Sequence, residues 1–262
     1  MNGNKEHHYL GVGTMFGFGK KKSQATTISD TKPQRFGIRA RFDAAQNSTD
    51  NAKHWAMADP FSPDLAASPQ VRATLRNRAR YEVANNSYAK GMVLTLANDC
   101  VGTGPRLQML LPDDAANKVI EQMFKDWADE ISLAAKLRTA RMARVVDGET
   151  FCIKTYNPML RSPIKLDLKL VEAEQVTTPW EKQSITSPNQ ADGIEFDAFG
   201  NRLLYYILKQ HPYSASQFYD AGYDIVAAQN VMHLYRVDRA GQNRGIPEIT
   251  PALPLFAQLR RY

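Results

Sequence analysis

The sequence predicts an α+β protein in which helices pack on a mostly antiparallel sheet, with a disordered basic tail at the N-terminus. Before residue 147, apolar residues recur every three or four positions, which is the period of a helix. From Asp147 and Gly148 onward they alternate, as in strands with one buried and one exposed face. Alternation of this kind favours antiparallel pairing.

The tail carries the whole charge excess. The formal net charge is +6, and residues 1–41 hold eight basic and two acidic residues, so the rest of the chain is balanced. We expect residues 1–35 to be a disordered, solvated arm. The sharper alternative is an arm that contacts DNA or an acidic partner, through Lys20, Lys21, Lys22, Arg35, Arg39 and Arg41. Because residues 42–262 have no excess of basic residues, we do not expect this part of the chain to bind nucleic-acid phosphates tightly.

The first predicted helix follows Ser68, a good N-cap, with Pro69 at the first helical position. Its circumference carries four arginines, for which solvation or pairing with acidic neighbours is a more common role than phosphate binding: Arg72, Arg76, Arg78 and Arg80.

The next helix ends at an elbow. Its predicted apolar face holds Tyr88, Met92, Val93, Leu96 and Cys100. A glycine cap and a proline then stop it, at Gly102, Gly104 and Pro105. Because phosphate loops precede a helix, this loop is a structural turn. The cluster Gly11–Lys22 also fails as a phosphate loop, because Thr14 and Lys21 replace the required glycine and hydroxyl.

Two more helices are predicted after a short strand at residues 106–111. Asp113 or Asp114 caps the first, whose apolar face includes Phe124 and Trp127. Ser132 caps the second, and its basic side is expected to be solvated: Lys136, Arg138, Arg141 and Arg144.

Strands follow. We expect them at residues 149–156 and 164–172, in a hairpin over 193–210 that turns at Asp197, Gly200 and Asn201, and at 230–237. Arg244, Gly245 and Pro247 are expected to make a second structural turn, which aims a final helix. That helix stops within an apolar stripe at Tyr262, so we expect a longer protein.

Residue patterns typical of catalysis or metal binding are weak in this sequence. The histidines show no zinc-ligand spacing, and His233 is expected to be packed or hydrogen-bonded within its strand. Cys100 and Cys152 are expected to be buried reduced thiols, which indicates synthesis in the cytosol. The densest acidic groups favour capping and solvation by their places at helix starts and on exposed helix faces: Asp113 with Asp114, and Asp126 with Asp129 and Glu130. We therefore expect no enzyme, catalytic residue, cofactor or metal; a metal-dependent hydrolase would need carboxylates gathered in space.

No apolar run approaches the ~20 residues of a membrane span.

Three stretches in order, at residues 75–108, 194–208 and 230–253, resemble the lambda-like family of bacteriophage portal proteins. The third contains the motif Arg-Ala-Gly-Gln-x-Arg-Gly-x-Pro at residues 239–247. The resemblance extends from about Phe36 to the end of the chain.

The resemblance implies a ring of identical subunits, usually twelve, at one capsid vertex, through which double-stranded DNA is packaged and ejected. It implies terminase, capsid and head–tail connector proteins as partners, no membrane, and a place in the virion, with the host cytoplasm during assembly or as a prophage product. The domains expected are a tail at 1–35, a portal wing-like α+β domain at 36–246 and the start of a helix at 247–262. The alternative is a DNA-binding packaging factor that acts through the basic tail.

Overall fold

The computed structural model describes residues 48–50, 52–182, 189–214 and 222–261. Contacts divide the chain into two units, Met1–Ala58 and Asp59–Tyr262, and the architecture below belongs to the second. The tail predicted for residues 1–35 lies outside the described residues.

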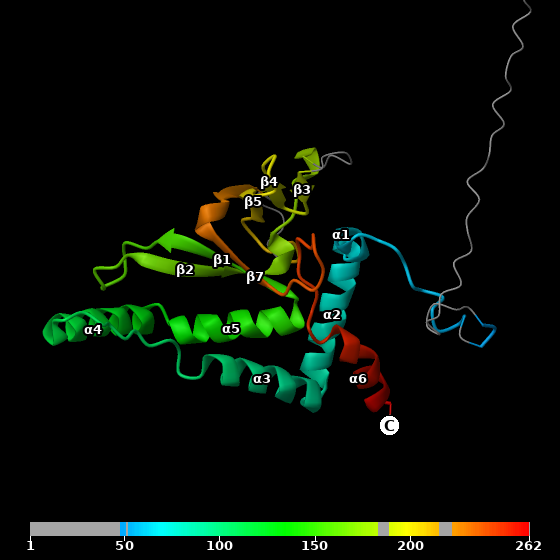
Figure 1. The fold of residues 1–262 in the computed structure, drawn as a ribbon, viewed down its shortest axis with the longest axis horizontal. Helices are drawn as coiled ribbons and strands as arrows, with labels where there is room; N and C mark the ends of the chain where they lie inside the picture. The colour runs from blue at the N-terminus through cyan, green and yellow to red at the C-terminus, as the bar shows by residue number, and fades with distance from the viewer. Residues whose placement is uncertain (1–47, 51, 183–188, 215–221, 262) are drawn as a thin grey trace, which may run out of the picture. The chain divides into compact units, whose positions relative to one another are not determined.

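The second unit has the mixed α+β architecture that the sequence predicted (Figure 1). Its helices are α1 (Pro63–Ala66), α2 (Pro69–Asn85), α3 (Ser87–Val101), α4 (Asp114–Glu130), α5 (Leu133–Val146) and α6 (Leu253–Leu259). Its strands are β1 (Glu149–Tyr156), β2 (Leu166–Val171), β3 (Gln190–Ala191), β4 (Ile194–Phe196), β5 (Arg202–Leu208), β6 (Tyr223–Ala227) and β7 (Val231–Tyr235). None of these helices is long and apolar enough to span a membrane.

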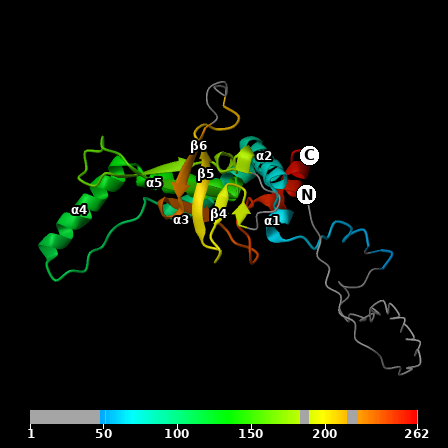
Figure 2. The ribbon, with the colours of Figure 1, turned by 90° about the horizontal axis from the view of Figure 1, so that it is seen from above.

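The strands form two sheets. A three-stranded sheet has the order β2-β1-β7, and a four-stranded sheet has the order β3-β4-β5-β6, with every pair antiparallel. The predicted hairpin is the β4–β5 pair. Helix α5 covers one face of the three-stranded sheet, and α3 lies on the far side of α5, so that sheet, α5 and α3 make three successive layers (Figures 1 and 2).

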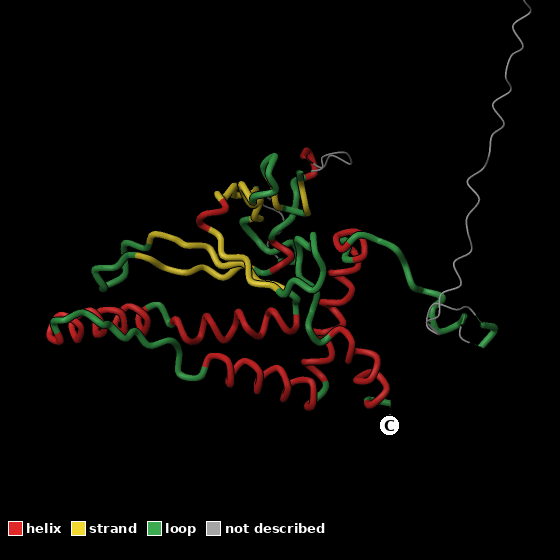
Figure 3. The backbone as a smooth tube through the Cα atoms, in the orientation of Figure 1, coloured by secondary structure: helices red, strands yellow, loops and turns green. Residues whose placement is uncertain are grey.

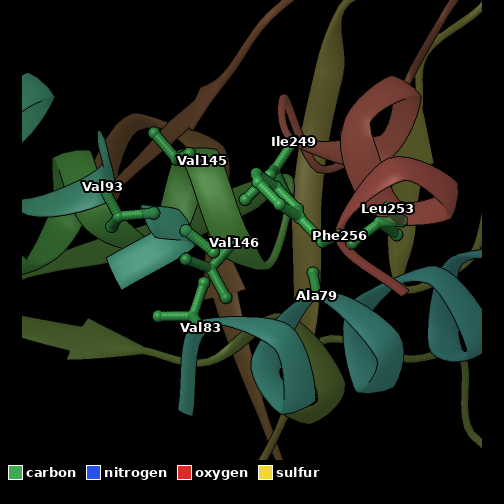
Figure 4. Packing of buried hydrophobic residues seen from close by; sticks show 9 residues of the cluster. Ala79, Val83, Val93, Val145, Val146, Ile249, Leu253 and Phe256 are labelled. Carbon is green, nitrogen blue, oxygen red and sulfur yellow. The ribbon is translucent and has the colours of Figure 1, made fainter. Parts of the chain in front are cut away.

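Small and branched residues join the helices. Ala79 and Val83 from α2 and Val93 from α3 pack with Val145 of α5 and Phe256 of α6 in one buried cluster (Figure 4). A second cluster, between the two sheets, contains Phe151, Val171, Val176, Ile194, Tyr205, Ile207 and Val231. The first cluster includes Ile249, just after the loop 236–247, and the second includes Val231, the first residue of the strand that precedes this loop.

Helix caps agree in part with the sequence. Asp113 accepts hydrogen bonds from the N–H groups of Ala115 and Ala116, as predicted. Ser132 stands at the N-cap position of α5, but its backbone is left-handed, with φ 55° and ψ 46°, and its side chain makes no cap hydrogen bond. Because an N-cap side chain reaches the helix N–H groups from an extended backbone, this conformation removes the expected cap.

The prediction of a strand at residues 106–111 is wrong, because the structure has a loop there (Figure 3). Side chains of α4, and not a neighbouring strand, bind two of its backbone N–H groups. The N–H of Met109 donates to Glu121 at 2.8 Å, and the N–H of Leu111 donates to Asn117 at 3.1 Å. Strand-like composition alone could not supply a partner strand.

Helix α3 presents most of its predicted apolar face to solvent, and only Val93 of that face is buried. Tyr88, Met92 and Leu96 are 73%, 47% and 42% exposed, while Ala89 and Ala97 are buried together with Val93. Small side chains on the inner face let α3 approach α5 closely, so the larger residues are turned outward. Cys100 lies at the exposed end of this helix, which corrects the expectation of two buried thiols; Cys152 is buried, and both are free.

Gly102 ends α3 with φ 55° and ψ −126°, and Gly104 follows with φ 96°. A Cβ atom at Gly102 would meet nothing within 4 Å, so only the backbone conformation opposes a side chain there. Gly102→Val is therefore expected to lower the free energy of unfolding by about 1–3 kcal/mol. Thermal unfolding measures this loss, and a melting temperature equal to that of the wild type would contradict it.

Candidate functional site

A buried ionic network lies where α2, β1, β7 and the loop 236–247 meet. Its centre is Glu149, the first residue of β1, which is fully buried. Arg244 Nε donates to both carboxylate oxygens, at 2.9 and 3.0 Å, and the Gly245 N–H donates at 2.9 Å. His233 Nε2 lies 2.8 Å from the same carboxylate. A buried charge is tolerated only when it is paired and hydrogen-bonded, and Glu149 meets this condition.

Arg244 connects the two sheets. Its side chain is 2% exposed and donates to the carbonyl oxygens of Val176 at 3.1 Å, Ala173 at 3.2 Å and Asp192. Asp192 precedes β4 of the four-stranded sheet, whereas Glu149 begins a strand of the three-stranded sheet. The five donors of a guanidinium suit one side chain to this role of joining several acceptors.

The loop that carries Arg244 is held at several points. Gln242 accepts from the N–H of Asp238 at 2.9 Å and donates to the carbonyl of Arg244 at 2.9 Å. Asn243 donates to Asp64 from its backbone at 2.9 Å and from its side chain at 2.7 Å. These contacts fix the loop before the guanidinium enters the core.

Two glycines allow the loop to reach β1. Gly148 has φ +92°, and a Cβ there would lie 2.6 Å from Ile246 C and 2.7 Å from Pro247 N. A Cβ at Gly245 would collide with the backbone oxygen of Gly148. The backbones therefore pass at a separation that only glycine permits.

Helix α2 brings three arginines to the same network. Arg72, Arg76 and Arg80 are spaced by four residues and so share one helix face. Arg72 pairs with Asp192, and Arg76 Nε lies 2.8 Å from Glu174. Arg80 contacts three carboxylates: Asp147 at 2.6 Å, Glu174 at 2.8 Å and Glu172 at 3.2 Å. Pairing with acidic neighbours is thus confirmed for these three.

Burial and charge set the protonation states of the network. Burial alone would raise the pKa of Glu149, but Arg244 and His233 hold that pKa well below its usual range. Burial lowers the pKa of His233 more than Glu149 raises it, so the ring is neutral at pH 7. Burial and the nearby Arg244 lower the pKa of Arg72 to about 10, which still leaves it cationic.

Stability is expected to fall as the pH drops below about 6.5, the value for an unperturbed histidine. Because the pKa of His233 is lower in the folded state, the unfolded chain takes up the proton first, and protonation favours unfolding. His233→Gln is expected to remove most of the change between pH 7 and 5, measured by urea unfolding. The exposed His54→Gln is the control and should retain it; an unchanged slope in His233→Gln would contradict this assignment.

The predicted solvated face of α5 is largely paired. Arg141 and Arg144 both bind Glu248, at 2.9 and 2.6 Å, and Lys136 lies 2.6 Å from Asp167. Arg138 is exposed, as predicted. The two pairs with Glu248 could not be predicted from the sequence, because Glu248 lies about a hundred residues beyond α5.

One cluster of side chains among the described residues has the spacing of a metal site. Glu172, Glu174 and His211 place ligand atoms within 4.8 Å of one another. Arg80 already occupies both carboxylates. The backbone N–H of Tyr213 donates to His211 Nδ1, which places the proton of the neutral ring on Nε2, the atom that faces Glu172. The arrangement is therefore an ion-pair cluster and fits a cation poorly. The carboxylates near Asp126 do not gather: Asp126 accepts from Gln122, and Glu130 accepts from the Arg161 and Ser162 backbone.

The structure places the two predicted turns in different settings. Gly102, Gly104 and Pro105 form the loop after α3, away from the network, whereas Arg244, Gly245 and Pro247 belong to it. The predicted contact residues Lys20, Lys21, Lys22, Arg35, Arg39 and Arg41 lie outside the described residues. Sequence reasoning did not identify Glu149 or Asp192. The signal at Glu149 was a carboxylate in the buried register of a strand.

The ionic network joins helix α2, the two sheets and the loop 236–247 to one another. In the part of the chain that the structure describes, the charges of the network are paired with one another, with Glu149 and Arg244 buried and Arg80 and Glu172 partly in contact with solvent. A scan against family models matches residues 49–262 to "Phage portal protein, lambda family". The comparison with curated proteins found no match.

Proposed function

Because the chain belongs to the lambda family of phage portal proteins, we propose that it is a subunit of a ring that forms the DNA channel at one capsid vertex. The family is structural and implies an oligomeric assembly associated with the capsid. In this role the chain does no catalysis and needs no cofactor. Double-stranded DNA passes through the ring without being held tightly, because the chain beyond residue 41 has no excess of cations that would retain a duplex.

The proposed partners follow from this place. Terminase drives DNA through the ring, capsid proteins surround it, and head–tail connector proteins attach after packaging. The ring is proposed to be dodecameric. The protein is located in the virion at the capsid vertex, after assembly in the host cytoplasm or as a prophage product.

The observation that carries the proposal is the family match over most of the chain, and the buried network supports it. A subunit that bears mechanical load during packaging needs its sheets and helices joined. Arg244 makes this connection with hydrogen bonds to Glu149, Val176, Ala173 and Asp192. Such a network suits a framework better than a site that must exchange a ligand.

Phage assembly in the absence of this protein tests the proposal. Capsids made without it are expected to contain no DNA, and supplying the full-length protein should restore DNA-filled capsids. DNA-filled capsids in its absence would contradict the portal role.

The cationic tail favours one rival, a DNA-binding packaging factor. The rival predicts a monomer that shifts duplex DNA in a gel, with affinity that falls steeply as salt rises and is lost when residues 1–41 are deleted. The portal proposal predicts that the protein without residues 1–41 still forms rings.

A further inference from the structure

The outward face of α3 is an apolar stripe without a partner among the described residues of 59–261. Tyr88, Met92 and Leu96 are spaced by four residues and lie in one line along the helix. All three are substantially exposed. Figures 1 and 2 show α3 as the outer layer beyond α5, on the side away from the three-stranded sheet.

Gly91 gives a second indication. Glycine in a helix interior costs about 1 kcal/mol relative to alanine, so it calls for a reason. A Cβ at Gly91 would meet nothing within 4 Å, which means that packing inside the chain supplies no reason. Gly91 and the exposed Thr95 are four residues apart on the side of the stripe, where small residues would let another helix approach closely.

The stripe also has a charge at one end. Asp99 follows Leu96 by three residues, is exposed and makes no ion pair among the described residues. On α4, exposed Lys118 likewise has no ion pair there and adjoins the exposed apolar residues Val119 and Met123. If α3 of one copy packed antiparallel to α4 of another, Asp99 could face Lys118. Leu96 lies about 4.5 Å from Asp99 along the helix axis and would then face the gap between Val119 and Met123.

We propose that the α3 stripe binds α4 of a second copy of this chain, with Asp99 of one copy facing Lys118 of the next. The inference rests on the proposed function, because a ring of identical subunits requires each to present two different complementary faces. Within one chain α3 leads away from α2 and α4 leads back toward α5, so the two helices run in opposite directions (Figure 1). A neighbour related by a small rotation would keep that antiparallel relation.

A charge exchange tests the pairing in the full-length protein. Asp99→Lys and Lys118→Asp are each expected to raise the concentration at which half of the chains assemble by at least about tenfold, since each creates a like-charge contact. The double variant Asp99→Lys/Lys118→Asp restores opposite charges and is expected to recover most of the wild-type assembly. Mass photometry across a dilution series measures all three.

Met92→Glu tests the apolar part and is expected to weaken assembly at least about tenfold. Lys90→Glu is the matched control, because Lys90 is exposed but lies on another side of α3, and it should assemble like the wild type. Thermal unfolding verifies that each variant folds. If Met92→Glu does not fold, the charge exchange still decides the question.

Each outcome bears on a different statement. Wild-type assembly in Met92→Glu and in both single charge variants would overturn the α3–α4 interface and leave the ring intact. Single variants that are defective without recovery in the double variant would overturn the Asp99–Lys118 pairing. A wild-type protein that remains monomeric at every concentration would contradict the proposed function itself.

Discussion

Arg244→Met is expected to lower the free energy of unfolding by about 3–5 kcal/mol, because it leaves the Glu149 carboxylate buried without its cation. Among the described residues, the carboxylate would retain hydrogen bonds only with the Gly245 N–H and His233. The carbonyl oxygens of Ala173 and Val176 would also lose their donor. Urea unfolding followed by circular dichroism measures the loss.

Arg78→Met is the matched control. Arg78 is an exposed arginine on α2, so the same chemical change should alter the free energy of unfolding by no more than about 0.5 kcal/mol. Replacing both charges, as in Glu149→Leu/Arg244→Met, is expected to recover part of the loss, since the unpaired buried charge is removed. A loss below about 1 kcal/mol in Arg244→Met would show that the network does not join the two sheets as described.

Gly148→Ala is also expected to have a large effect, a loss of about 2–6 kcal/mol in the free energy of unfolding. The positive φ of +92° disfavours any side chain, at about 1–3 kcal/mol. The new methyl group would also press on the backbone of Ile246 and Pro247 at 2.6–2.7 Å, which adds an overpacking cost of about 1–3 kcal/mol. The loop that carries Arg244 would have to move, and thermal and urea unfolding would both report the change.

Gly200→Ala separates the two causes. Gly200 has a similar φ of +83°, but a Cβ there would meet nothing within 4 Å. Its loss is expected to be the conformational part alone, about 1–3 kcal/mol. Equal losses in the two variants would mean that the close approach of the loop to β1 adds nothing.

The sequence predicted the elements that local signals determine. Alternation marked β1 and β7, the turn residues near Gly200 marked the β4–β5 hairpin, and Asp113 marked the start of α4. In each case a periodicity or a cap is written within a few residues. The α+β class and the family resemblance followed from these segments.

Features that depend on distant residues were missed or misjudged. The segment 106–111 has strand composition, but side chains of α4 and not another strand bind two of its N–H groups. The stripe of α3 looked like a core face because Ala89 and Ala97, which are buried, carry little hydrophobic signal. Glu149, Asp192 and Arg244 come from separate parts of the chain, and only the fold brings them together.

Electron microscopy of the purified full-length protein tests the portal assignment most directly. We expect closed rings of one subunit number with a central hole wide enough for duplex DNA, whether or not residues 1–41 are present. Monomers, or open filaments without a central hole, would contradict it.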